Sequence, residues 1–324
     1  MTPTEAKEQV AGFVQTDPTK SPPPLPADWR ALGATIGFDP RPANKLRFYL
    51  VGDHGSGKST FVQSRPRNLV LSFEDSARFV PNPRSHRIDR EKVPNYQSFS
   101  KVWDLIVADA AKPNRPFDSI TFDTVDHLLD ILNQGLVEKI NPKDKNGDLI
   151  YPLRWDDITD YGTSKKGGKG WDMLYTELKN ILNELSAIGY GWMCVSHLNE
   201  KTITKADGSD YTDIRISMPP GGARIVCREA DFIINMDHKY TRATIESPPS
   251  VVTVAGKKVA KPAQVTYKSI ETWVAEVASV RVKSTKRRVT MEDEIPLSKD
   301  NGYGDFAAAY ERAVENERKR IAAP

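Results

Sequence analysis

Short apolar runs that end in a polar residue alternate with helical periodicity along most of this chain. Such runs are typical of buried strands in a parallel sheet, because both faces of these strands are covered. The helical stretches repeat apolar residues every three or four positions, as in 98–111, 126–140 and 171–188. This alternation predicts an α/β fold with a mainly parallel, twisted sheet flanked by helices. The predicted strands are residues 48–51, 68–73, 117–123, 191–196 and 231–236.

Two regions depart from this alternation. Residues 201–218 predict a hairpin that turns at 206–209, and residues 250–282 are β-rich and predict an antiparallel extension of the sheet. The other boundaries follow from composition. Proline-rich residues 1–40 predict a flexible arm, which is either a tether to a neighbouring subunit or a plain disordered tail. We therefore expect a core at 41–290 and a C-terminal helical tail at 291–324.

Composition narrows the class of protein. The chain has 324 residues with 39% hydrophobic and 27% charged content, which is typical of a globular protein. A net charge of +3 does not by itself predict a nucleic-acid partner. Two cysteines make no disulfide framework, and neither a signal peptide nor an apolar run of about 18 residues is present. We expect a cytoplasmic protein without a membrane partner.

The most specific motif follows the first predicted strand. Gly52, Gly57, Lys58 and Ser59 have the G-x-x-x-x-G-K-S spacing of a phosphate-binding loop. Glycines allow backbone N–H groups to converge on phosphate oxygens, Lys58 adds a positive charge, and the hydroxyl of Ser59 is placed to ligate Mg²⁺. The expected cofactors are ATP and Mg²⁺. The residues expected to bind them are Gly52, Asp53, His54, Gly55, Ser56, Gly57, Lys58, Ser59 and Thr60.

Three polar residues lie at the ends of other predicted strands. Glu74 follows the second, Asp123 closes the third and His197 follows the fourth. The carboxyl ends of parallel strands border the ligand crevice of an open α/β sheet. We therefore expect Asp123 to be a second magnesium-binding group and His197 to contact the γ-phosphate.

Basic residues gather in three further places. The segment 141–170 mixes lysines with aromatic residues, which suits single-stranded nucleic acid as well as a solvated loop. The hairpin carries other cations, and residues 283–288 form a basic cluster that is either a solvated face or a source of cations for a neighbour's site. The candidate DNA-binding residues are Lys165, Lys166, Lys169, Lys201, Lys205 and Arg215. The candidate trans-acting cations are Lys283, Lys286, Arg287 and Arg288.

In this order of motifs, residues 44–290 resemble the RecA-like core ATPases, and most of all the short recombinase-like ATPases of bacteriophages. The resemblance implies that Glu74, in LVLSFEDSARF, activates water, and that Asp123, in ITFDT, belongs to the second acidic motif. His197, in MCVSH, occupies the place of a γ-phosphate sensor that is often glutamine in RecA proteins. Lys58, Glu74 and His197 are thus the expected catalytic residues. The two DNA-binding loops would correspond to the lysine-rich segment and the hairpin.

The resemblance implies a DNA-stimulated ATPase that binds single-stranded DNA for annealing or strand exchange in phage recombination or repair. It would act in the host cytosol as a homo-oligomeric ring or filament, with a single-strand-binding protein as a candidate further partner. Two alternatives remain on the same fold. One is a helicase or packaging motor, and the other is a nucleotide-gated scaffold or loader with little turnover.

Overall fold

The computed structural model describes residues 39–80, 83–140, 158, 169–204, 209–247, 250–254, 257–261, 264–277 and 291–322. The chain divides into two compact units, Met1–Arg41 and Pro42–Pro324, and all described helices and strands lie in the second. Residues 1–38 of the predicted arm lie outside the described residues. No helix in the described part of the chain is both long enough and apolar enough to cross a membrane.

Strands and helices alternate between residues 47 and 204, as the apolar pattern predicts. The strands are β1 (Arg47–Gly52), β2 (Asn68–Ser72), β3 (His86–Asp89), β4 (Ser119–Asp123), β5 (Gly191–Thr204), β6 (Asp210–Ile216), β7 (Phe232–Ser247), β8 (Ser250–Val254), β9 (Lys257–Lys261), β10 (Gln264–Glu276) and β11 (Glu294–Leu297). The helices are α3 (Lys58–Gln63), α4 (Tyr96–Ala110), α5 (Val125–Ile140), α6 (Lys169–Ala187), α7 (Pro220–Glu229) and α8 (Gly302–Ala322), with 3₁₀ helices η1 (Ala43–Lys45), η2 (Asp75–Phe79) and η3 (Arg90–Lys92).

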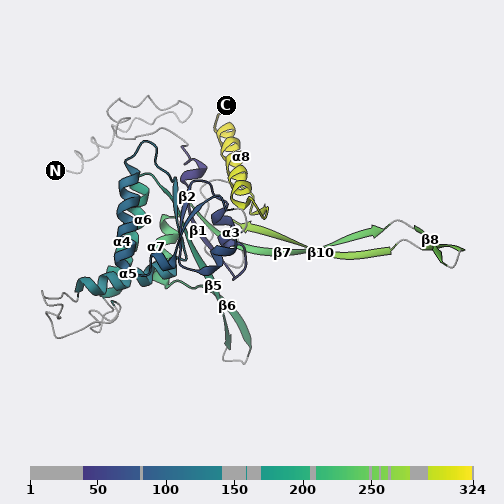
Figure 1. Cartoon of the computed structure of the whole chain (residues 1–324), viewed down its shortest axis with the longest axis horizontal. Coiled ribbons are helices and arrows are strands. Elements are labelled where there is room, and N and C mark those ends of the chain that lie inside the picture. Colours follow the sequence, from purple (N-terminus) through teal and green to yellow (C-terminus); the bar gives the residue numbers. More distant parts are fainter. Residues whose placement is uncertain are drawn as a thin grey trace, which may run out of the picture. The chain divides into compact units, whose positions relative to one another are not determined.

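Nine of the described strands form one sheet in the order β11–β10–β7–β1–β5–β4–β2–β3, and β6 pairs with β5 outside this order (Figure 1). Neighbours from β7 to β3 are parallel. β10 runs antiparallel to both β7 and β11. The predicted fold class is confirmed: a mainly parallel sheet, flanked by helices, with an antiparallel extension.

Helices cover both faces of the sheet, which is why its central strands are almost wholly apolar. On one face, α4, α5, α6 and α7 pack on alternate strand residues in one continuous core that includes Tyr49, Leu71 and Phe122. Local sequence also sets where these helices begin. At the start of α4, for example, the side chain of Asn95 accepts a hydrogen bond from the backbone N–H of Ser98 at 2.9 Å.

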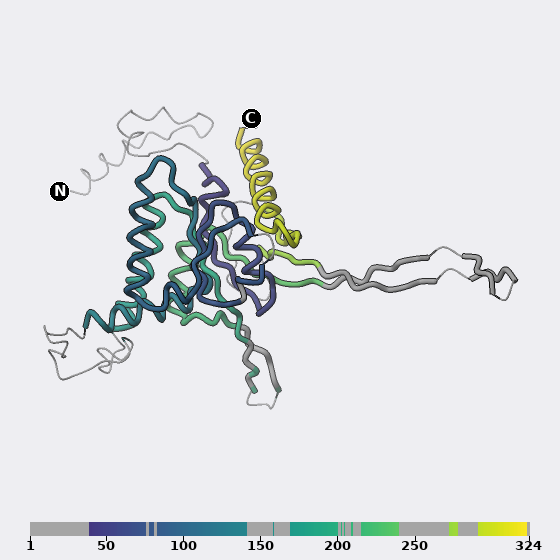
Figure 2. Tube along the Cα trace, viewed as in Figure 1, coloured from purple at the N-terminus to yellow at the C-terminus, as the bar shows by residue number. Residues whose placement is uncertain are grey.

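The opposite face is covered by α3 and α8, which are far apart in the sequence but lie side by side (Figure 2). Phe306 of α8 is fully buried, and its ring lies 5.2 Å from that of Phe48, 5.4 Å from Phe232 and 6.1 Å from Phe61 between ring centroids. β11 extends the same sheet. Residues 291–322 thus pack as part of the core unit rather than as the appended helical tail expected from the sequence.

Several strands are longer than their apolar runs predicted. β5 does not end at His197 but continues to Thr204, because β6 replaces β1 and β4 as its partner beyond this point. β7 likewise continues from the expected strand 231–236 to Ser247, since β10 pairs with residues 235–247 of this strand. The paired strands of the predicted hairpin are confirmed as β5 and β6, whereas residues 205–208 of its turn lie outside the described residues. A polar strand outside the core is stabilised by backbone pairing with one partner, which apolar content does not reveal.

Candidate nucleotide-binding site

The phosphate-binding loop connects β1 to α3 and is built on glycine. Gly55 and Gly57 have φ angles of +80° and +89°, a left-handed conformation that side chains with a Cβ rarely adopt. A Cβ at Gly57 would also lie 3.0 Å from Cε3 of Trp273 on β10. Gly57 is the residue before α3. The loop can therefore bring its backbone N–H groups close to a bound phosphate, as phosphate binding requires.

Lys58 is buried at the centre of this loop. Its Nζ donates hydrogen bonds to the carbonyl oxygens of Gly52, at 2.8 Å, and Asp53, at 2.7 Å. Burial lowers the pKa of Lys58 to about 8, against the opposing attraction of Asp123 and Glu74. A cation with little access to water is one that a phosphate oxygen stabilises strongly.

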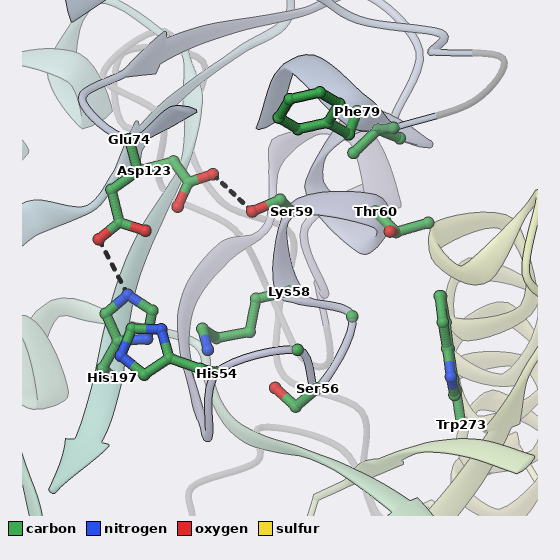
Figure 3. Close-up of a pocket in the computed structure, with 13 residues that line it drawn as sticks. His54, Ser56, Lys58, Ser59, Thr60, Glu74, Phe79, Asp123, His197 and Trp273 are labelled. Carbon is green, nitrogen blue, oxygen red and sulfur yellow. Dashed lines mark hydrogen bonds and ion pairs between the residues drawn. The ribbon is translucent and has the colours of Figure 1, made fainter. Parts of the chain in front are cut away.

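Ser59 and Asp123 meet beside Lys58 (Figure 3). Ser59 Oγ donates a hydrogen bond to Asp123 Oδ2 at 3.0 Å. Asp123 ends β4 and is only 1% exposed, and this burial raises its pKa to about 6. A hydroxyl and a carboxylate oxygen, both hard donors, suit Mg²⁺, which binds proteins through one or two carboxylates together with phosphates.

Glu74 and His197 form a second pair in the same site. Glu74 Oε1 and His197 Nε2 lie 2.9 Å apart, and this hydrogen bond is the main reason that the pKa of Glu74 is lowered. The imidazole of His54, on the phosphate-binding loop, stacks on that of His197 with 3.9 Å between ring centroids. His197 Nδ1 is buried without a hydrogen-bond partner among the described residues. The stacked rings and the carboxylate thus form one polar cluster over the loop.

Together these side chains line a cavity of about 210 Å³, which also includes Thr60, Phe79, Val80 and Trp273 (Figure 3). Neither Phe79 nor Trp273 was predicted from the sequence as a site residue. Phe79 is 84% exposed at the end of η2, and Trp273 comes from a strand more than 200 residues after the loop. No local motif marks either residue.

The structure brings together the phosphate-binding loop, Glu74, Asp123 and His197, and the described candidates Lys169 and Arg215 do not line this cavity. Lys169 is exposed at the start of α6, and Arg215 is exposed on β6. Lys201 lies on β5, where only its backbone is described. The remaining candidate cations lie outside the described residues: Lys165, Lys166, Lys205, Lys283, Lys286, Arg287 and Arg288.

The chain is similar to one domain family and to solved structures. No curated protein matches the chain. A solved structure that does match is flagellar accessory protein FlaH from Methanocaldococcus jannaschii, with 13% identity, coverage of 80% of this chain and 88% of that chain, and a TM-score of 0.30. These low values support no inference about function. A family model described as an AAA domain matches residues 44–296 and so includes every residue that lines the cavity. The chain therefore belongs to the AAA domain family of P-loop ATPases.

Proposed function

We propose that this protein is an ATP-dependent, single-stranded DNA-binding ATPase of the RecA-like recombinase class, which supports annealing or strand exchange. The observation that carries the proposal is the Glu74–His197 pair. A carboxylate beside the phosphate-binding loop is hydrogen-bonded to a histidine on β5, and that strand continues directly into the β5–β6 hairpin. Hydrolysis and the hairpin are therefore connected through one strand.

In this proposal the loop and Lys58 bind the phosphates. The Lys58 ammonium exchanges the carbonyl oxygens of Gly52 and Asp53 for the more negative β- and γ-phosphate oxygens. Ser59 and Asp123 would hold Mg²⁺, which when bound supplies positive charge to those oxygens. Asp123 must be ionised for this role, so burial that raises its pKa opposes binding at acid pH.

Glu74 is the residue that polarises the attacking water. Its pKa is lowered mainly by the hydrogen bond from His197, so the carboxylate is ionised at neutral pH and can accept a proton. Water attacks the γ-phosphorus, the bond to the β-phosphate oxygen breaks, and ADP leaves. Because His197 shares a hydrogen bond with Glu74, a contact between His197 and the γ-phosphate would compete with that bond. His197 then reports whether the γ-phosphate is present.

The DNA-binding part of the proposal rests on the hairpin and its exposed Arg215, and on Lys169 next to the lysine-rich segment. Cations at such positions bind the backbone of single strands without reading sequence. Assembly of several copies would add cations in trans from residues 283–288.

The test is the ATPase rate with and without single-stranded DNA at low salt. We expect stimulation by DNA, and we expect Glu74→Gln to keep ATP binding while turnover falls by about 10²- to 10⁴-fold. Glu138→Gln, an exposed acid on α5, is the matched control and should hydrolyse ATP as the wild type does. A wild-type ATPase rate that is the same with and without DNA would contradict the DNA-binding part of the proposal. Intact ATP binding with negligible wild-type turnover would favour a nucleotide-gated scaffold.

A further inference from the structure

Asp126, in the first turn of α5, holds two serines from different strands. Its Oδ2 accepts a hydrogen bond from Ser196 Oγ at 2.8 Å, and its Oδ1 accepts one from Ser217 Oγ at 3.0 Å. The two serine oxygens also lie 3.0 Å from each other. The Asp126 carboxylate thus accepts both hydroxyl protons, and the contact between the serine oxygens completes a triangle of polar groups. Nothing in the hydrolytic mechanism above uses these three side chains.

Each of the three residues lies next to a part of the nucleotide site or of the hairpin. Asp126 lies three residues after Asp123, Ser196 directly precedes His197, and Ser217 directly follows β6. The backbones of Ser217 and His197 are joined as well. Ser217 N–H donates to the His197 carbonyl oxygen at 2.9 Å, and His197 N–H donates to Ser217 Oγ at 3.3 Å. Both strands of the hairpin are therefore tied, at their base, to the helix that follows Asp123.

The triangle is partly shielded from water, because Asp126 and Ser217 are half-buried. Ser196 is fully buried, and the Tyr49 hydroxyl lies next to it and 3.9 Å from Met218 Sδ. Burial raises the pKa of Tyr49 well above its ordinary value. Buried hydrogen bonds to a charged group are strong, and loss of one partner leaves the others unsatisfied. The three elements are thus expected to move together.

We propose that Asp126 is a positioning residue that transmits the nucleotide state to the β5–β6 hairpin. The inference rests on the proposed function in that ATP is the ligand and its γ-phosphate contacts His197. When the γ-phosphate draws His197 from Glu74, β5 shifts at this residue. The Asp126 carboxylate then moves the base of β6 along with β5 instead of letting the two strands part. The hairpin would respond to ATP whether or not DNA is present.

The test is amide hydrogen exchange of residues 198–216, measured with and without a non-hydrolysable ATP analogue and without DNA. In the wild type, we expect the analogue to change the exchange rate of the hairpin by about fivefold or more, a typical size for coupling between sites. In Asp126→Ala, the hairpin should lose this response while residues 52–60 stay protected by the analogue. Asp126→Asn should keep part of it, because the amide can accept from one serine and donate to the other.

The outcomes separate coupling from a merely structural role. A structural role would raise hairpin exchange equally with and without the analogue, leaving the ratio as in the wild type, and would overturn the inference. The inference would also be overturned if the analogue protected residues 52–60 of the wild type but left the exchange rate of the hairpin unchanged. Glu138→Gln, on the same helix, should behave as the wild type. If Asp126→Ala does not fold, Ser217→Ala removes the contacts of Ser217 Oγ but keeps the Asp126–Ser196 hydrogen bond, and should weaken the response. An unprotected wild-type loop would refute ATP binding and this inference together, whereas absent DNA binding would leave this inference intact.

Discussion

Asp123→Asn should stabilise the nucleotide-free protein at neutral pH although it destroys the predicted metal site. The carboxylate is buried at the end of β4, and the asparagine amide oxygen can still accept the hydrogen bond of Ser59. The substitution removes a negative charge from a site that burial makes unfavourable for charge. Function, not folding, would then explain why a carboxylate is here.

The magnitude follows from the pKa of Asp123. Burial raises this pKa from 3.8 to about 6, so the folded state holds a proton over a range where the unfolded state has lost it. The cost of ionisation is absent below about pH 4, develops as the pH rises to about 6, and is complete above that. Roughly two pKa units correspond to about 3 kcal/mol. Because asparagine does not titrate, the stability difference between variant and wild type should change by about this amount between the two limits.

The assay is urea unfolding of both proteins at pH 4.5 and pH 7.5, without nucleotide. The relative stability of Asp123→Asn should rise with pH, whereas Asp104→Asn, an exposed acid on α4, should stay within about 0.5 kcal/mol of the wild type at both values. A change below about 1 kcal/mol for Asp123→Asn would refute the reasoning. Magnesium and ATP should reverse the ranking, since ligand at about 100 times its Kd adds about 2.7 kcal/mol to a protein that binds it.

Other predictions follow from single contacts. Phe306→Ala should lower the free energy of unfolding by about 3–5 kcal/mol in urea titrations, and Phe306→Leu by less than about 1.5 kcal/mol, because α8 fills the core behind α3. Gly57→Ala should abolish ATP binding measured by calorimetry, because of its φ of +89° and the contact to Trp273; unchanged affinity would contradict the loop geometry. ATP affinity should fall as the pH rises above about 8, where Lys58 loses its proton, by at most about tenfold per pH unit. Arg215→Ala should reduce the slope of log affinity for single-stranded DNA against log salt by about 0.7.

The sequence by itself determined the strands that carry the site. Residues such as Tyr49 and Phe122 lie in strands covered on both faces, so apolar runs marked these strands, and the glycine spacing after β1 marked the phosphate-binding loop. Because parallel strands end at one edge of a sheet, the order of motifs also predicted that Glu74, Asp123 and His197 would be neighbours. Local propensity, burial and chain direction are enough for these conclusions.

Tertiary structure alone decided which side chains complete the site. Trp273 reaches the loop because β10 pairs with β7 along its whole length, and His54 stacks on His197 because Gly52 and His197 are paired between β1 and β5. The extent of β5 beyond His197 and the packing of α8 were likewise decided by partners distant in the sequence. A contact between residues far apart in the chain depends on the register of the strands that carry them, and no periodicity within either segment encodes that register.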